Sequence, residues 1–178
     1  MSRIGKAPIP IPDKVKVEIK GDLVSVATAD GKKQMSQAVS MVNVKVADNH
    51  VILEAGDESR DARARHGLYR TLIANMIDGV TKGWEKRLEI HGAGYKAELQ
   101  GQKLMLTVGY TYPREFTIPE GIELELTNPT TIVLKGIDKA LVGQTAASLR
   151  HVRPPDPYRG KGIRYTGEQA VRKTAKGK

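Results

Sequence analysis

An internal repeat is the feature of this sequence that most restricts its fold. VILEAGD at 51–57 and IVLKGID at 132–138 each join an apolar triplet to a terminal aspartate, and they lie 81 residues apart. Leu68 and Leu149 keep the same offset, and strand patterns followed by a helical pattern occur twice. We therefore interpret the chain as a duplicated module. Two unrelated small domains that follow a common pattern are the alternative.

The first half of the chain predicts two hairpins and a helix. VKVEIKGDLVSVATADGKK and MVNVKVADNHVILEA alternate apolar and polar residues around turn-forming pairs, among them Asp48-Asn49. From Asp57 the apolar period becomes helical, with Asp57 as the expected N-cap and Gly79 near the end. The residues expected on the inward face of this helix are Ala62, Leu68, Leu72, Ile73, Met76 and Ile77.

The second half repeats this order. Five strand patterns follow Gly83, and a helix is predicted over 138–151. HGAGY at 91–95 lacks the third glycine and the following helix of a dinucleotide-binding loop, so we expect a bulge or tight bend there. The predicted fold class is α+β, with two similar domains from an internal duplication, each a mainly antiparallel sheet with one packed helix. The predicted domains are 1–82, with an extended N-terminal entry segment, and 83–178, with a basic, extended C-terminal segment.

Charge is concentrated at one end of the chain. The formal net charge is +9. Residues 151–178 hold eight Lys and Arg against two acids, whereas the first 150 residues hold 21 against 18. Such asymmetry indicates a polyanionic partner, RNA or DNA before a membrane. No stretch of eighteen apolar residues is present, so no membrane span is predicted.

Residues for catalysis or metal binding are not assembled in recognisable patterns. The chain has no cysteine, which fits a reducing cytosol. His50, His66, His91 and His151 show no metal-ligand spacing, and no G-x-S-x-G nucleophile motif is present. We therefore predict no enzyme activity, no catalytic residue, no metal and no cofactor.

The segment RPPDPYRGKGIRY, residues 153–165, combines residue types suited to nucleic-acid binding. Its prolines favour an extended path, and its glycines allow a close backbone approach to a surface. Its cations can meet phosphates, and its tyrosines can stack on a base or hydrogen-bond a ribose. A solvated, disordered basic tail is the alternative interpretation.

A family resemblance narrows the partner. The run NPTTIVLKGIDKALVGQTAASLRHVRPPDPYRGKGIRY, 128–165, resembles the signature region of the L6 family of bacterial large-subunit ribosomal proteins. MSRIGKAPIPIP and HGLYRTLIANMIDGVTKGWEKRLEIHGAGYKAEL are also similar, so the resemblance covers nearly the whole chain. Asp156 and Arg159 stand where the family usually has Glu and Lys, which keeps both charges. Ala140 stands where the family often has Gln, so no RNA contact is assigned to it.

The resemblance implies two duplicated domains and a structural role in the large ribosomal subunit, in the cytoplasm. It implies binding to 23S ribosomal RNA near the stalk base and the sarcin–ricin loop, where translational GTPases dock. The expected partners are therefore 23S rRNA, neighbouring large-subunit proteins and, nearby, those GTPases. If about six phosphates are neutralised, affinity should fall about a thousandfold between 50 and 200 mM salt.

The expected RNA contacts fall into four groups. They are the phosphate-binding cations Arg150, Arg153, Arg159, Lys161 and Arg164; the stacking residues Tyr158 and Tyr165; the path-setting residues Pro154, Pro155, Gly160 and Gly162; and Lys139 and Gln144 on the second helix.

Two rival functions remain open at this point. The first is an enzyme acting on nucleic acid through a histidine and a carboxylate, which single replacements of His66, His91 and His151 would reveal. The second is a DNA-binding or chaperone-like basic protein. Competition between structured rRNA and duplex DNA would reveal that one, although no predicted helix carries a concentrated basic face.

Overall fold

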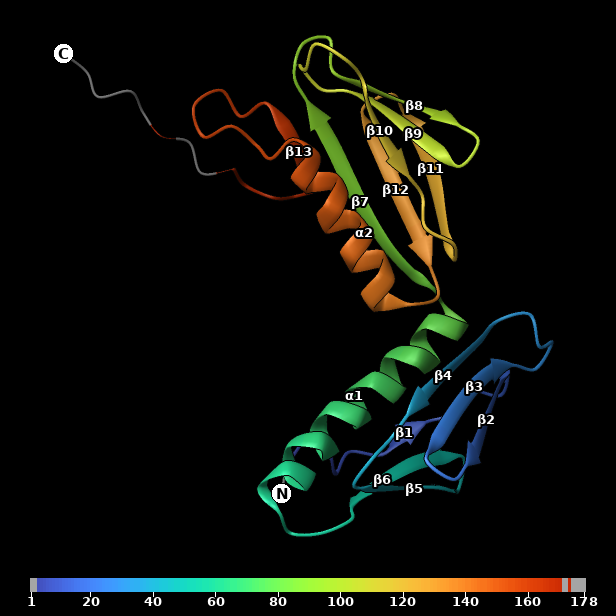
Figure 1. Cartoon of the computed structure of the whole chain (residues 1–178). Helices are drawn as coiled ribbons and strands as arrows, with labels where there is room; N and C mark the ends of the chain where they lie inside the picture. Colours follow the sequence, from blue (N-terminus) through green and yellow to red (C-terminus); the bar gives the residue numbers. More distant parts are fainter. Residues whose placement is uncertain (1–2, 171–172, 174–178) are drawn as a thin grey trace. The chain divides into compact units, whose positions relative to one another are not determined.

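A computed structural model describes residues 3–170 and 173 of the chain (Figure 1). The remaining residues of the predicted basic tail, 171–172 and 174–178, lie outside the described part. The chain divides into two compact units. One holds the chain up to Gly83 together with Ile137–Lys139, and the other holds Trp84–Gly136 and the chain from Ala140.

The first unit consists of two three-stranded antiparallel sheets and one helix, with the sheet orders β2-β3-β4 and β1-β6-β5. The β5–β6 turn is the predicted Asp48-Asn49 pair, and both residues have the positive φ that a tight hairpin turn requires. The helix α1 lies against β3, β4 and β6 and buries Ile73, Met76 and Ile77 in an aliphatic core. The elements are β1 (Ile9–Pro10), β2 (Val15–Lys20), β3 (Leu23–Thr28), β4 (Gln34–Ala38), β5 (Val42–Ala47), β6 (His50–Ala55) and α1 (Arg60–Thr81).

The second unit has its own core, a three-stranded sheet β10-β9-β8 and a four-stranded sheet β11-β12-β7-β13. The helix α2 buries Val142, Ala146 and Leu149 in this core, which also holds Leu88 and Ile90 of β7. The elements are β7 (Trp84–His91), β8 (Lys96–Gln100), β9 (Lys103–Thr107), β10 (Arg114–Thr117), β11 (Ile122–Asn128), β12 (Thr131–Gly136), α2 (Lys139–Val152) and β13 (Gly162–Tyr165).

The two units share one topology. In each, three consecutive strands form an antiparallel meander, β2–β4 in the first unit and β8–β10 in the second. In each, the hairpin that precedes the helix pairs through its second strand with the first strand of the unit, β6 with β1 and β12 with β7. The predicted duplicated α+β fold is confirmed. β13 has no counterpart among the described residues of the first unit, so the basic segment sets the second unit apart from the first.

Two predictions about α1 are wrong. Its N-cap is Ser59, whose hydroxyl accepts the backbone N–H of Ala62 at 3.1 Å. Asp57 instead accepts the backbone N–H of Ser59 at 3.0 Å, so it supports the cap without being it. Leu68 does not face inward and is 53% exposed. The buried face passes through His66, and two residues correspond to about 200° of helix rotation, which turns Leu68 to the opposite side.

HGAGY forms the expected tight bend between β7 and β8. Gly92 and Gly94 both have positive φ, and the N–H of Tyr95 donates to the carbonyl of Gly92 at 3.2 Å. No helix in the described part of the chain is long and apolar enough to span a membrane.

Candidate nucleic-acid interface

The basic segment, residues 153–165, is a closed loop that ends as a sheet strand. At its base the N–H of Ile163 donates to the carbonyl of Arg153 at 2.8 Å. Its last four residues form β13, which pairs antiparallel with β7 at the edge of the four-stranded sheet (Figure 1). The strand pairing holds the C-terminal end of the segment on the second unit, and the hydrogen bond from Ile163 holds Arg153, its N-terminal end, beside that strand.

Asp156 organises the tip of this loop. Its carboxylate accepts the backbone N–H of Arg159 at 2.9 Å and that of Tyr158 at 3.3 Å. Its backbone N–H donates to the Lys161 carbonyl, and its carbonyl accepts from Gly160, both at 2.8 Å. The hydrogen bonds from Arg159 and Tyr158 lower the pKa of Asp156. The turn leaves Tyr158 63% exposed and Arg159 exposed.

The two glycines of the segment lie inside the protein. Gly162 is buried with φ of +144°, and a Cβ there would lie 2.6 Å from the carbonyl oxygen of Pro154. Gly160 is also buried, with φ of +68°. The close approach expected of Gly162 is therefore to the chain's own Pro154 and Pro155, of which Pro154 is exposed and Pro155 half-buried.

Arg150 is engaged within the protein. Its guanidinium forms a two-pronged ion pair with Glu168, with Nε to Oε2 at 3.0 Å. The bond from Arg150 lowers the pKa of Glu168. The same carboxylate accepts the backbone N–H of Tyr165 at 3.0 Å. Glu168 therefore joins the last turn of α2 to the end of β13.

Arg164 is held by a relay across β13 and β7. Its Nη2 donates to Nδ1 of His91 at 3.1 Å, because a guanidinium has no acceptor. Nε2 of His91 then carries the proton and donates to Glu89 at 3.0 Å. The bond from His91 lowers the pKa of Glu89.

The other predicted contact residues differ in accessibility. Within the described residues, the side chains of Arg159 and Lys161 have no ion-pair partner. Tyr165 packs against the core of the second unit. Lys139 opens α2, Gln144 lies on the same helix, and both are exposed. The structure thus brings residues 150–165 together and places Gln144 on the same unit.

The loop between β9 and β10, residues 108–113, lies against the start of the basic segment and was not predicted as part of the site. The Tyr110 hydroxyl donates to the carbonyl of Val152 at 2.9 Å. The guanidinium carbons of Arg153 and Arg114 lie 5.0 Å and 4.8 Å from the centre of its ring. The run YTYPR at 110–114 has the aromatic, proline and arginine content of the basic segment, and this was the available signal.

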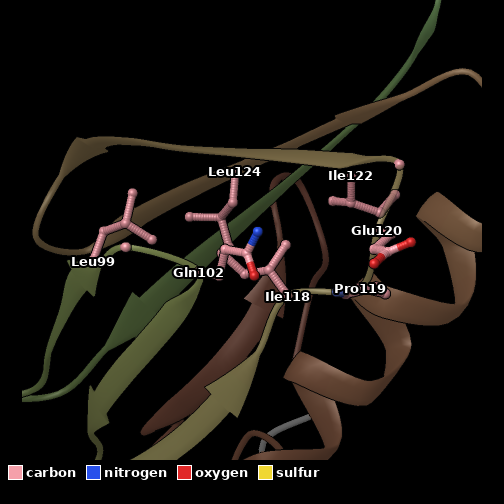
Figure 2. Close-up of a pocket in the computed structure, with 9 residues that line it drawn as sticks. Leu99, Gln102, Ile118, Pro119, Glu120, Ile122 and Leu124 are labelled. Carbon is pink, nitrogen blue, oxygen red and sulfur yellow. The ribbon is translucent and has the colours of Figure 1, made fainter.

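A hollow elsewhere on the second unit offers little chemistry. Its volume is about 450 Å³, and Figure 2 shows its lining side chains. Glu120 is the only charged residue among those that line it. In the described chain no group of three His, Cys, Asp or Glu side chains could hold a metal ion. The hollow is lined by Leu99, Gly101, Gln102, Ile118, Pro119, Glu120, Gly121, Ile122 and Leu124.

The histidines are dispersed. His50 contacts the carbonyl of Asp48 through Nδ1 at 2.7 Å, and His151 is exposed in the last turn of α2. His66 is buried, with Nε2 3.0 Å from the Leu53 carbonyl. His91 belongs to the relay that holds Arg164. The four histidines therefore lie on four different elements, β6, α1, β7 and α2.

Comparison with known proteins identifies the family. The model of the family described as ribosomal protein L6 matches residues 11–83 and again residues 91–166. A protein of Synechocystis sp. named large ribosomal subunit protein uL6 is 53% identical over 176 residues, covering 99% of this chain and 98% of that protein. The proteins of the same name from Acaryochloris marina and Synechococcus elongatus are 52% and 53% identical, with the same coverage. Because the family model matches both units and the relatives align over nearly their whole length, the chain belongs to the ribosomal protein L6 family.

Proposed function

We propose that this chain is a structural, non-enzymatic component of the large ribosomal subunit in the cytoplasm, and that it binds 23S ribosomal RNA through its second unit. The basic segment bridges RNA helices near the stalk base and the sarcin–ricin loop, where translational GTPases dock. Neighbouring large-subunit proteins are its other partners. The names of the relatives support a place in the large ribosomal subunit, and the family resemblance supports the position near the stalk base and the sarcin–ricin loop.

The observation that carries RNA binding is the loop built around Asp156. Arg159 and Tyr158 project from a turn that backbone hydrogen bonds have already organised, so binding orders few additional groups. Arg159 presents a planar fork that matches phosphate oxygens, and Tyr158 presents a ring for a sugar or base. Arg150 and Arg164 are already paired with Glu168 and His91, and their first role in this proposal is to position β13.

The engagement of these arginines changes the expected salt dependence. If Arg159 and Lys161 alone neutralise phosphates, affinity falls only about tenfold between 50 and 200 mM salt. If all five predicted cations and one more contribute, the fall is about a thousandfold. The affinity for a 23S rRNA transcript, measured over a range of salt concentrations, therefore gives the number of phosphates that the protein neutralises.

Competition tests the proposed partner. The complex of the protein with labelled 23S rRNA is challenged in separate titrations with unlabelled 23S rRNA and with a duplex DNA of equal phosphate content, at the same salt concentration. The rRNA should displace the label at lower concentration, and preference for the duplex would refute the proposal. The protein should also co-sediment with large ribosomal subunits and leave them only at high salt.

A further inference from the structure

The most exposed large aromatic side chain in the described chain is Tyr112, at 79%. It lies in the 108–113 loop, and within the described residues its hydroxyl and ring have no hydrogen-bond or cation partner. A ring that is exposed to this degree contributes little to the stability of the fold, because it contacts water in both the folded and the unfolded state. Its exposure leaves the ring available to a partner outside the chain.

The loop that carries Tyr112 is anchored on both sides. Before it, Val108 is buried, and a Cβ on Gly109, where φ is +76°, would lie 2.3 Å from the Tyr95 hydroxyl. Tyr110 is held by its hydrogen bond to Val152 and lies between two arginines. After Tyr112, Pro113 restricts the Tyr112 backbone to extended conformations. Tyr112 is thus an exposed ring on a loop with fixed ends.

Tyr112 lies close to the start of the basic segment. Arg153, the first residue of that segment, stacks on Tyr110, and two residues of chain span at most about 7 Å. An RNA strand whose phosphates contact the basic segment can therefore place a neighbouring nucleotide over Tyr112. Bases stack on exposed aromatic rings without regard to sequence, provided that they are unpaired.

We propose that Tyr112 is a stacking platform for one unpaired RNA base, next to the phosphate contacts of the basic segment. The inference rests on the proposed function and adds the class of RNA element: a helix that carries a bulged or looped-out nucleotide. Tyr110 is a positioning residue, which holds the platform through Val152 and Arg153. Stacking on an uncharged ring neutralises no phosphate and so adds nothing to the salt exponent, in contrast to the contacts of Arg159 and Lys161.

Four proteins binding a 23S rRNA transcript test the proposal: the unmodified chain, Tyr112→Ala, Tyr112→Leu and Tyr112→Phe. Loss of one base stack should raise Kd by about 5- to 150-fold in the Ala variant, with an unchanged salt exponent. Tyr112→Leu should bind as weakly as Tyr112→Ala, and Tyr112→Phe should bind like the unmodified chain. Leu99→Ala, which truncates another exposed apolar residue of the second unit, is the matched control and should not change Kd.

The outcomes separate the two proposals. If the unmodified chain does not bind the transcript, the proposed function fails. If it binds and Tyr112→Ala binds equally well, only the stacking inference is overturned. Tyr112→Leu binding at full strength would also overturn it, because that result indicates a general apolar contact such as a protein neighbour makes. Equal far-ultraviolet circular dichroism of all variants confirms that they fold.

Discussion

The carboxylate of Asp156 accepts the backbone N–H of Arg159 at 2.9 Å. An acidic side chain thereby fixes the backbone from which a basic side chain projects. The net positive charge of the segment alone would suggest that attraction to RNA is the only function of its charged residues. The acid also accepts from Tyr158, so one carboxylate orients both residues that we expect to contact RNA first. Its role is geometric.

Replacing Asp156 with alanine should therefore weaken binding of 23S rRNA several-fold, although the change removes a negative charge. A purely electrostatic view predicts tighter binding. Asp156→Asn keeps one acceptor oxygen in place and should lose less affinity than the alanine variant. Filter binding at fixed salt measures both, and tighter binding by Asp156→Ala would contradict the geometric role.

Removing Arg159 and Lys161 together should lower the salt dependence of binding. Each phosphate contact contributes about 0.7–0.9 to the slope of log K against log salt, so the double alanine variant should lose about 1.4–1.8. The matched control is Lys96→Ala with Lys103→Ala, which removes the same charge from lysines paired with Glu98 and Glu115. An equal loss of slope in the control would show that net charge, rather than contact, sets the dependence.

The ion pair between Arg150 and Glu168 predicts a pH-dependent contribution to stability. The folded-state pKa of Glu168 lies below its ordinary value, mainly through the bond from Arg150. The contribution is thus fully present above the ordinary glutamate pKa and is lost as pH falls through the lower, folded-state pKa. At pH 7, Glu168→Gln should cost about 1 kcal/mol or less, because the pair is partly exposed.

Thermal unfolding of the two proteins across pH checks this expectation. The difference in Tm between the unmodified chain and Glu168→Gln should shrink as the medium is acidified below about pH 4. Glu125→Gln breaks a more exposed pair with Lys135 and should give a smaller difference at pH 7. A Glu168→Gln difference that persisted undiminished at pH 3 would be incompatible with the ion pair as its source.

Local chemistry explains which features the sequence could predict. The Asp48-Asn49 turn follows from residues adjacent to it, and the alternating strands follow from a period of two. The exposure of Leu68 depends on which face of α1 meets the sheets, which packing decides. Arg164 meets His91 across 73 residues of sequence, and Tyr110 meets Val152 across 42. The composition of the basic segment indicates a nucleic-acid contact. Which of its cations remain accessible to RNA depends on the pairing of β13 with β7, which composition does not reveal.

The repeat makes a direct comparison of Leu68 and Leu149 possible. Leu149 is fully buried, so Leu149→Ala should cost about 2–5 kcal/mol in the free energy of unfolding. Leu68→Ala, at the same offset, should change it by about 0.5 kcal/mol or less. Urea unfolding monitored by fluorescence of the single tryptophan, Trp84, reports on the second unit, and circular dichroism reports on both. Equal costs would mean that Leu68 is buried in solution.

Two glycines of the second unit should respond to alanine in opposite directions. At Gly162, φ is +144° and a Cβ would lie 2.6–2.8 Å from the backbone of Pro154 and Pro155, which cannot move without opening the basic segment. Gly162→Ala should therefore cost about 1–3 kcal/mol. Gly143 lies within α2, where a Cβ meets nothing within 4 Å, so Gly143→Ala should stabilise by about 0.5–1 kcal/mol. Both are measured by urea unfolding through Trp84. A stable Gly162→Ala variant would mean that the segment is not closed over its prolines, and the accessible positions of Tyr158 and Arg159 would then no longer follow from the turn.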